Sequence, residues 1–524
     1  METPRTESNR AVGAPTWALI GVVSTLVGLA VGQLVAALVR PDASPVLATG
    51  STVIDLTPTP LKNWAIETFG TADKAILLGS VLVVVLVLAA VAGLLARRRL
   101  VAGATLEGLL VLVATVLALV RPQSGVLDAV PGIATGVAGV GSLVLLHRVA
   151  TSGLSSLPWL HPADDEADAG ARPTRRGVLL AAGALAVVAA AAGGASRLVA
   201  RLRTGPADVT LPPATDPAGA FPTGLDGKVK GITPLRTAIG DFYRVDTRLD
   251  VPAVDVDSWT LTIDGDVENE LTFTFDDLLA MDLIERDITL TCVSNSVGGP
   301  YAGGARWLGV RLTDLLDQAG VGDQADQILS TDFDGMTIST PLAVATDGRD
   351  AMIAVGMNGE ALSQVHGFPA RMVVPGLYGF VSACKWITRM TLTTYDDAQA
   401  YWTERDWATD APIKISARID TPAALEQLDA GEVTIGGVAW AQQSGGVGQV
   451  QVSIDGGPWT DAEAGPDVAN DYWRQWFLRW DAEPGSHSIS ARVVTGSGEV
   501  QQNVRADPFP DGASGIHTLQ VTVG

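Results

Sequence analysis

Cysteine is scarce in this sequence, which has only Cys292 and Cys384 among its 524 residues. Two thiols exclude a disulfide-rich scaffold and any zinc or iron–sulfur site with four cysteine ligands, because such sites need more thiolates than the chain has. A metal site with one thiolate, a single disulfide, or two buried packing residues remain as interpretations. The c-type haem attachment pattern Cys-x-x-Cys-His is also absent.

Histidine and positive charge are in short supply as well. Of the five histidines only His147 lies near a long apolar run, which excludes a haem held by two histidines inside a membrane. Lysine and arginine number 35 against 57 acidic residues, so the formal net charge is −22 and the pI is about 4.5. Nucleic acid is therefore excluded as a partner, because its phosphates would be repelled.

Apolar residues, in contrast, are abundant. They make up 47% of the chain, and the mean hydropathy is +0.27, too high for a wholly soluble protein of this length. Runs of about 20 apolar residues, long enough to cross the hydrocarbon core, predict a membrane domain of about five helices over residues 1–202. The expected spans are Trp17–Val39, Ala75–Ala96, Val101–Val120, Val130–Leu146 and Gly177–Val199.

Arginines between these runs predict the orientation. They fall on one side of the membrane if the N-terminus is inside. These residues are Arg5, Arg10, Arg97, Arg98, Arg99, Arg148, Arg172, Arg175 and Arg176. The pattern predicts a multi-pass protein of the cell membrane whose chain beyond about Arg203 is extracytoplasmic.

Two features of the membrane region have more than one interpretation. Arg175 and Arg176 precede a modestly hydrophobic stretch rich in alanine and glycine, so the pair fits either a twin-arginine export signal or ordinary positive-inside anchors. Glu107 is the clearest acid within a span, and we expect it at the membrane interface rather than on an ion pathway.

Beyond the membrane region the composition changes three times. Residues 203–232 are rich in proline, glycine and small side chains and predict a linker. Residues 233–410 mix short strands such as WTLTIDGDV with short helices such as TFDDLLAM, which predicts an α+β domain. Residues 411–524 alternate apolar and polar positions in short segments separated by turns, which predicts an immunoglobulin-like β-sandwich.

Five stretches, all ahead of the predicted sandwich, carry a resemblance to a known family. In chain order they read FYRVDTRLDVPAVDVDSWTLTIDGDV, TLTCVSN, GARWLGVRLTDLL, MNGEALSQVHGFPARMVVPGLYG and CKWITRM. The ordered set resembles the sulfite oxidase family of molybdenum enzymes, over about Asp241 to Gly524. The membrane region has no counterpart in the soluble members of that family.

The resemblance implies a molybdenum centre held by molybdopterin, a pyranopterin dithiolene, and by one protein thiolate, a donor that suits such a metal. Cys292 matches the metal ligand, so we expect it to be catalytic. The pterin phosphate needs positive charge and hydrogen-bond donors. The other cofactor-binding positions implied are Tyr243, Arg244, Asp334, His366, Arg371, Ala383, Cys384 and Lys385. Asp332 is a rival of Asp334 in this alignment.

Two positions depart from the family pattern. Sulfite oxidases usually carry a basic residue just after the Cys-x-x-Asn element, where it helps to bind sulfite, and Ser296 and Val297 stand there instead. The active-site tyrosine of the family aligns near Gln399, so Tyr401, two residues away, is the second expected catalytic residue. The alternative for Tyr401 is a packing role.

These observations predict a membrane-anchored molybdenum-cofactor oxidoreductase. It would catalyse two-electron oxygen-atom transfer on a small sulfur-containing or similar substrate. It would exchange electrons with an external carrier, either a separate cytochrome or a quinone-linked protein. The reaction direction stays open, and the alternatives are an exported methionine-sulfoxide-type reductase and a non-catalytic membrane-anchored binding scaffold. A homodimer formed through the C-terminal domain and a monomer both remain compatible with the sequence.

Overall fold

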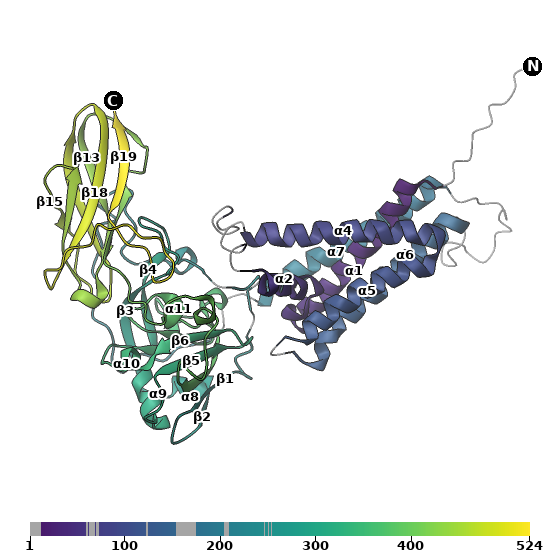
Figure 1. Ribbon diagram of the computed structural model, residues 1–524, viewed down its shortest axis with the longest axis horizontal. Coiled ribbons are helices and arrows are strands. Elements are labelled where there is room, and N and C mark those ends of the chain that lie inside the picture. The colour runs from purple at the N-terminus through teal and green to yellow at the C-terminus, as the bar shows by residue number, and fades with distance from the viewer. Residues whose placement is uncertain are drawn as a thin grey trace, which may run out of the picture. The chain divides into compact units, whose positions relative to one another are not determined.

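The computed structural model describes residues 12–58, 61, 69, 73–121, 124–153, 174–203, 209–245, 247–249, 251–252 and 254–524. The chain forms two compact units, one of residues 1–205 with 247–253, and one of residues 206–246 with 254–524. The first unit is helical and the second is rich in β-strand (Figure 1). Arg5, Arg10 and Arg172, which contribute to the expected orientation, lie outside the described residues.

All five expected membrane spans are helical. The helices of this unit are α1 (Ala14–Val39), α2 (Pro45–Leu56), α4 (Asp73–Arg98), α5 (Leu100–Leu119), α6 (Ala129–Ser152) and α7 (Arg175–Arg203). All except α2 contain a stretch long and apolar enough to cross a membrane. The expected boundaries differ from the observed ones by a few residues, because helix ends depend on capping contacts as well as on hydropathy.

Close packing of small residues holds the helical unit together around α1. Gly21 of α1 faces Gly93 of α4 so closely that a methyl group on either would collide with the backbone of the other helix. Gly28 and Gly32 face Thr135 of α6 in the same way. In lipid, hydrophobic burial does not drive helices together, so close approach of this kind supplies the packing energy.

Five arginines of this unit lie at the end where α1 begins, whereas Arg40, Arg121 and Arg197 lie toward the opposite end. Trp17 contacts His147 at a ring separation of 5.3 Å, so α6 runs antiparallel to α1 and ends near its start. The Ser196 hydroxyl donates to the Gln33 carbonyl at 3.2 Å, so α7 runs parallel to α1. Arg97, Arg98, Arg148, Arg175 and Arg176 therefore share one end of the bundle.

Glu107 is buried inside the helical unit, whereas we expected it to face the membrane interface. Its side chain is 3% exposed and lies between α1, α5 and α6. The Thr25 hydroxyl donates to Glu107 Oε1 at 3.3 Å, and Gly139 lies against the same oxygen. Small and hydroxyl-bearing residues on the neighbouring helices leave the space that admits this carboxyl group.

The expected linker is packed against the β-rich unit from residue 209 onward. Arg203 still belongs to α7, but Val229 and Ile232 are buried. Farther back, the Thr215 N–H donates to the Leu283 carbonyl, and the Glu285 N–H donates to the Asp216 carbonyl, both at 2.9 Å. Scattered apolar residues between the prolines anchor this stretch, a pattern that composition alone does not reveal.

The first half of the β-rich unit is an α+β arrangement of two five-stranded sheets. One sheet has the order β2-β1-β10-β5-β6, and the other has the order β3-β4-β7-β8 with β9 also paired to β7. The strands are β1 (Thr260–Gly265), β2 (Leu271–Thr274), β3 (Leu283–Thr291), β4 (Ala302–Arg311), β5 (Gln327–Asp332), β6 (Thr337–Pro341), β7 (Met352–Met357), β8 (Glu360–Ala361), β9 (Arg371–Val373) and β10 (Ile387–Thr393). The short helices are α8 (Phe275–Leu279), α9 (Leu312–Ala319), α10 (Leu342–Ala345) and α11 (Gly379–Ser382).

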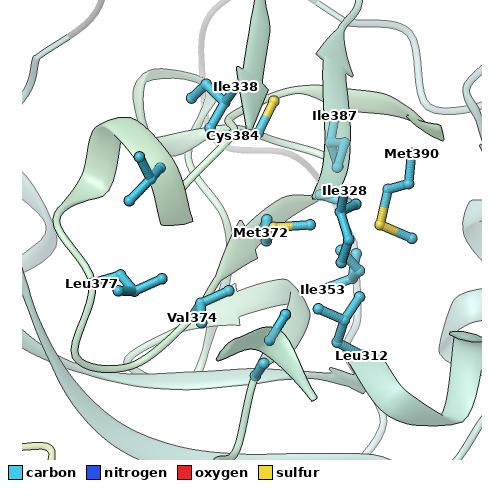
Figure 2. Close-up of a cluster of buried hydrophobic side chains, with 14 of the residues drawn as sticks. Leu312, Ile328, Ile338, Ile353, Met372, Val374, Leu377, Cys384, Ile387 and Met390 are labelled. Carbon is cyan, nitrogen blue, oxygen red and sulfur yellow. The ribbon is translucent and has the colours of Figure 1, made fainter. Parts of the chain in front are cut away.

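A large apolar core lies between these elements and positions the candidate site. Figure 2 shows Ile328 of β5, Ile353 of β7 and Met372 of β9 pointing toward one another. All three are fully buried. Because β9 contributes Met372 to this core, the neighbouring residues of that strand are held rigidly.

The second half of the β-rich unit consists of two sheets that share one core. One has the order β11-β13-β17-β16 and the other the order β12-β19-β18-β14-β15. Ile435 and Trp476 from the first sheet pack with Val450 and Ile489 from the second. The strands are β11 (Ser416–Thr421), β12 (Gln427–Leu428), β13 (Gly431–Trp440), β14 (Val447–Ile454), β15 (Thr460–Asp461), β16 (Glu463–Ala464), β17 (Arg474–Ala482), β18 (Gly485–Thr495) and β19 (His517–Val523).

Candidate functional site

Cys292 lies directly after β3, at the start of a tight loop. Its N–H donates to the Tyr301 carbonyl at 2.9 Å, and its carbonyl accepts from the Asn295 N–H at 3.0 Å. The side chain is buried, and burial raises the pKa of the thiol. Hydrogen bonds from the backbone and hydroxyl of Ser294, together with the charge of Lys385, act in the opposite direction on that pKa. The thiol thus has the positive and hydrogen-bonding neighbours that favour a thiolate ligand.

The loop after Cys292 is supported from the C-terminal sheets. The Arg418 guanidinium on β11 donates to the Gly299 carbonyl at 3.2 Å. The ring of His517 on β19 lies against Gly298, where an added Cβ would collide with it. Sequence reasoning missed Arg418 and His517, because more than a hundred residues separate them from the loop and no local pattern links them to it.

Arg371 is a buried cation. Its side chain begins β9 and is 5% exposed, and burial lowers its pKa to about 10. Its Nη1 donates to the His366 carbonyl at 3.3 Å, and its guanidinium carbon lies 5.1 Å from the centre of the Trp307 ring. Among the residues that the structure describes, no carboxylate lies within ion-pair distance of Arg371, and its Nε has no hydrogen-bond partner. A buried guanidinium in this state is suited to bind an anion.

Lys385 is brought beside Arg371 by an isolated β-bridge between the two residues. The turn at Gly367 makes this possible: its φ is +109°, and an added Cβ would lie 3.1 Å from both Arg371 and Lys385. The Cys384 carbonyl accepts from the Met372 N–H at 2.9 Å, so the run from Ala383 to Lys385 lies along β9. The two expected phosphate-binding cations are therefore neighbours.

His366 lies on the other side of Arg371. It is 3% exposed, and its Nε2 lies 3.0 Å from the Ile239 carbonyl, to which the neutral ring donates. Burial is the main cause that lowers its pKa to about 4, and the charges of Arg371, Lys385 and Arg244 add to it.

Tyr243 and Arg244 also reach this region. The Tyr243 ring stacks on Phe242 at 5.2 Å, and Phe242 contacts His366 at 5.5 Å. Burial is the main cause that raises the pKa of Tyr243, and the negative charge of the Cys292 thiolate raises it further. Arg244 is exposed and adds positive charge near His366.

Cys384 contributes its backbone rather than its thiol. Figure 2 shows its side chain among Ile338, Met372 and Ile387, and it is 1% exposed. Burial raises the pKa of this thiol well above its ordinary value. Both cysteines are free, so the structure has no Cys292–Cys384 disulfide.

The two rival aspartates have different environments. Asp332 is buried and accepts from the N–H groups of Asp334 and Met336 at 2.8 and 2.9 Å, so it closes the turn internally. The Phe333 N–H donates to the Trp386 carbonyl at 3.0 Å, which places this turn beside the run that ends at Lys385. Asp334 is half-buried on the same turn, so it stays the candidate for a pterin contact.

Tyr401 lies in a group of aromatic side chains. Its N–H donates to the Thr337 hydroxyl at 3.0 Å, its ring centre is 5.0 Å from that of Trp402, and the Arg405 guanidinium stacks on it at 3.6 Å. Tyr243 and Tyr378 are the tyrosines whose pKa values respond to the Cys292 charge. Tyr378 was missed as a site residue, although the GLYGF stretch that contains it was visible in the sequence.

Unsatisfied polar atoms test whether the pocket suits the expected cofactor. Buried polar groups are normally hydrogen-bonded. Near Cys292 and Arg371, four buried atoms have no hydrogen-bond partner within the described part of the chain: Thr291 Oγ1, Ser363 Oγ, Gln364 Oε1 and Arg371 Nε. These orphaned groups, a buried thiol and two adjacent cations fit a ligand with a thiolate-binding metal, a polar ring system and an anionic arm.

The neutral state of His366 predicts acid sensitivity. Its pKa is about 4 in the fold and 6.5 in the unfolded chain, so the unfolded state binds more protons between these values. Its contribution to stability is complete above about pH 6.5 and is lost as the pH falls toward 4. The loss amounts to at most about 3 kcal/mol.

Thermal unfolding of the full chain between pH 7 and 4 checks this prediction. His366→Gln places an amide near the position of Nε2 and does not titrate, so we expect its stability to fall less over this pH range. His487→Gln is the control. Because pairing with the exposed Asp455 raises the pKa of His487, its replacement should not lessen the loss of stability at low pH. Equal pH slopes for His366→Gln and the unmodified chain would contradict the assignment.

Comparison with known proteins gives a consistent result for the β-rich unit. Residues 248–402 match the family model of the oxidoreductase molybdopterin binding domain. Human mitochondrial sulfite oxidase is 30% identical over 310 residues, covering 49% of this chain and 55% of the relative. Inducible nitrate reductase [NADH] 2 of Glycine max is 29% identical over 292 residues, covering 44% of this chain and 32% of the relative. The chain thus spans about half the length of the curated sulfite oxidase and about a third of the length of the nitrate reductase.

A solved structure shares the fold. The sulfane dehydrogenase SoxCD from Paracoccus pantotrophus superposes with a TM-score of 0.50 and 24% identity, covering 56% of this chain and 82% of the other. The family match, the curated relatives and the site built around Cys292 agree on the cofactor. The β-rich unit of this chain thus contains a molybdopterin-binding oxidoreductase domain similar to that of the sulfite oxidases.

Proposed function

We propose that this protein is a membrane-anchored enzyme that oxidises a small sulfur compound and passes the electrons to an external carrier. The observation that carries the proposal is the buried Arg371, which has no acidic partner among the residues that the structure describes and lies beside Lys385 in the neighbourhood of the Cys292 thiol. In the overall reaction the substrate gains one oxygen atom from water, and two protons and two electrons are released. Each of two carrier molecules accepts one electron.

Each site residue has a role in this proposal. A bound molybdenum–molybdopterin group would supply the two-electron oxygen-atom transfer. Cys292 would be its protein ligand, and the hydrogen bonds from Ser294 would orient the thiolate and adjust its basicity. Arg371 and Lys385 would bind the phosphate, for which a guanidinium fork and an ammonium group are suited. His366, through its peptide carbonyl, holds Arg371 in place.

The remaining expected residues surround this centre. Tyr243, Arg244 and Asp334 are proposed contacts of the pterin, and the backbone from Ala383 to Lys385 would line the same pocket. Tyr401 stays a proposed catalytic residue; its N–H donates to the Thr337 hydroxyl, and its carbonyl accepts from the Arg405 guanidinium.

The charges near the loop after Cys292 indicate how much negative charge the substrate carries. Ser296 and Val297 carry no charge, and Arg418, which reaches Gly299, is paired with Asp420 at 2.6 Å. Loss of one charge-assisted contact costs about 1.5–3 kcal/mol, which weakens binding of an anion roughly 10- to 150-fold. The curated relative is a sulfite oxidase and the solved structure is a sulfane dehydrogenase, so both names concern sulfur. We therefore infer a sulfur substrate with less charge than the sulfite dianion.

The rest of the molecule supports the location. The arginines at one end of the bundle favour that end inside, which would place the β-rich unit outside the cytoplasm. Arg175 and Arg176 begin α7, which fits a twin-arginine signal as well as an anchor. The two sheets of orders β11-β13-β17-β16 and β12-β19-β18-β14-β15 support the proposal of an immunoglobulin-like sandwich, through which a homodimer would form.

Metal analysis and parallel assays test the function. Protein purified from its native membrane should contain molybdenum and release pterin on denaturation. It should then oxidise sulfite or an uncharged sulfur compound when an artificial electron acceptor is present. Turnover only with sulfoxides and a reduced dye would show the reverse reaction, and absence of molybdenum and pterin would favour the non-catalytic scaffold.

A further inference from the structure

We propose that the external carrier docks on a surface around Phe509, and that this carrier is a small basic protein with an exposed redox group. This inference rests on the proposed function, because an enzyme that passes its electrons to an external carrier needs a surface on which that carrier docks. The surface, named the Phe509 patch, is made of three rings and five acids: Trp402, Trp407, Phe509, Glu404, Asp406, Asp410, Asp507 and Asp511.

The centre of the Phe509 patch is aromatic. Phe509 is 52% exposed, and its ring centre lies 5.3 Å from that of Trp407, which in turn lies 6.0 Å from that of Trp402. The Ala408 N–H donates to the Pro510 carbonyl at 3.2 Å, so the two loops that carry these rings are joined. An exposed large aromatic ring on an ordered, hydrogen-bonded loop is typical of the centre of a protein interface.

The rim of the Phe509 patch is negatively charged. All five acids lie within three residues of Trp407 or Phe509 in the sequence; Asp511 is half-buried and the other four are exposed. Arg405 pairs with Glu404 at 3.5 Å and Lys414 pairs with Asp511 at 2.9 Å. Among the described residues, no basic group lies within ion-pair distance of the other three acids, Asp406, Asp410 and Asp507.

This combination selects a type of partner. An apolar centre with a rim in which acids outnumber their basic partners attracts and orients a protein whose own contact face is apolar and ringed by lysines. Nucleic acid and anionic lipid would be repelled by the same charges. A basic cytochrome with an exposed haem edge has the complementary face.

The Phe509 patch is connected to the candidate site by one short helix. Phe380 of α11 lies 5.5 Å from Trp407, ring centre to ring centre. The preceding residue, Gly379, lies against the Thr291 carbonyl and the Tyr243 hydroxyl, each 3.8 Å from where a Cβ would stand. Thr291 precedes Cys292 directly. A carrier on the Phe509 patch would therefore be separated from the cofactor site by few side-chain contacts.

Binding of oxidised cytochrome c, a small basic haem protein, to the molybdenum-loaded full chain tests this proposal without a substrate. We expect the double variant Asp406→Lys/Asp507→Lys to weaken binding measured by calorimetry at least tenfold, and Phe509→Ala to weaken it several-fold. The effect of the charge reversal should shrink as salt rises. Glu432→Lys is the matched control, because Glu432 is an exposed acid on β13 next to Arg479.

Turnover separates failure of this proposal from failure of the proposed function. Reduction of ferricyanide, a small anion that needs no docking surface, should be equal in all variants, whereas reduction of cytochrome c should fall with its binding. Lack of ferricyanide turnover in the unmodified enzyme would count against the function alone. Unchanged cytochrome binding in the variants would overturn the docking site. If Phe509→Ala lost a dimer while its cytochrome binding was unchanged, the Phe509 patch would be a contact between two copies of this chain instead.

Discussion

Cys292→Ser is expected to lower turnover per molecule by more than about 100-fold, since changes to mere outer-shell partners of metal ligands already cost 10- to 100-fold. A serine hydroxyl is a harder and much less acidic donor than a thiol, so it is poorly suited to replace a thiolate on molybdenum. The side chain is isosteric, and the loop hydrogen bonds to Tyr301 and Asn295 involve only the Cys292 backbone, so the fold should persist.

Two measurements and a control make this test decisive. The loaded variant should lose the visible absorption that a thiolate ligand gives a metal, and its pterin content should stay near that of the unmodified protein, because Arg371 and Lys385 remain. Cys384→Ala is the matched control. It removes the other thiol from an apolar core, so it should reduce stability by about 1–2 kcal/mol while turnover per bound molybdenum stays unchanged. Full turnover of Cys292→Ser would refute the ligand assignment.

Arg371→Met is expected to lose most of the bound cofactor. The guanidinium is 5% exposed and has no carboxylate within ion-pair distance among the described residues, so an anion is the group missing from its surroundings. Removing its charge-assisted hydrogen bonds costs about 1.5–3 kcal/mol, which corresponds to roughly 10- to 150-fold weaker retention. Molybdenum and pterin content after gel filtration measures this loss.

The same variant should leave the cofactor-free protein as stable as before, or more stable. Arg371 is a buried cation whose charge is unpaired without a ligand, and replacing such a group by an apolar side chain of similar length removes the desolvation cost. Opposite changes in cofactor retention and in cofactor-free stability are the signature of a ligand-binding arginine. Arg479→Met, at an exposed pair with Glu432, should change neither quantity. Full cofactor content in Arg371→Met, or strong destabilisation without cofactor, would contradict the assignment.

Much of the architecture follows from local pattern. Apolar runs of about 20 residues predicted five helices, and α1, α4, α5, α6 and α7 occupy those runs. Period-two alternation predicted the strands beyond residue 411, and β13, β14 and β18 lie there. These features are predictable because hydrocarbon thickness and the strand pleat impose a fixed period on neighbouring residues.

Other features depend on contacts that no local pattern encodes. The proline-rich stretch after residue 209 looked like a linker, but its scattered apolar residues, such as Val229, are buried against the β-rich unit. Glu107 looked like an interfacial acid, but glycine and threonine on neighbouring helices make room for it inside the bundle. In both cases the surroundings of the side chain decide the outcome, and those surroundings come from distant segments.

The candidate site, too, has features that the sequence predicted and features that only folding decided. The resemblance to the sulfite oxidase family, carried by short sequence stretches, was enough to single out Cys292, His366, Arg371 and Lys385 as candidates. Folding was needed to bring Arg371 against Lys385, to bury Cys384 as a core residue, and to carry Arg418 across to the Cys292 loop. The reason is physical: chemical capacity belongs to a side chain, whereas burial, charge pairing and distance arise only when remote parts of the chain pack together.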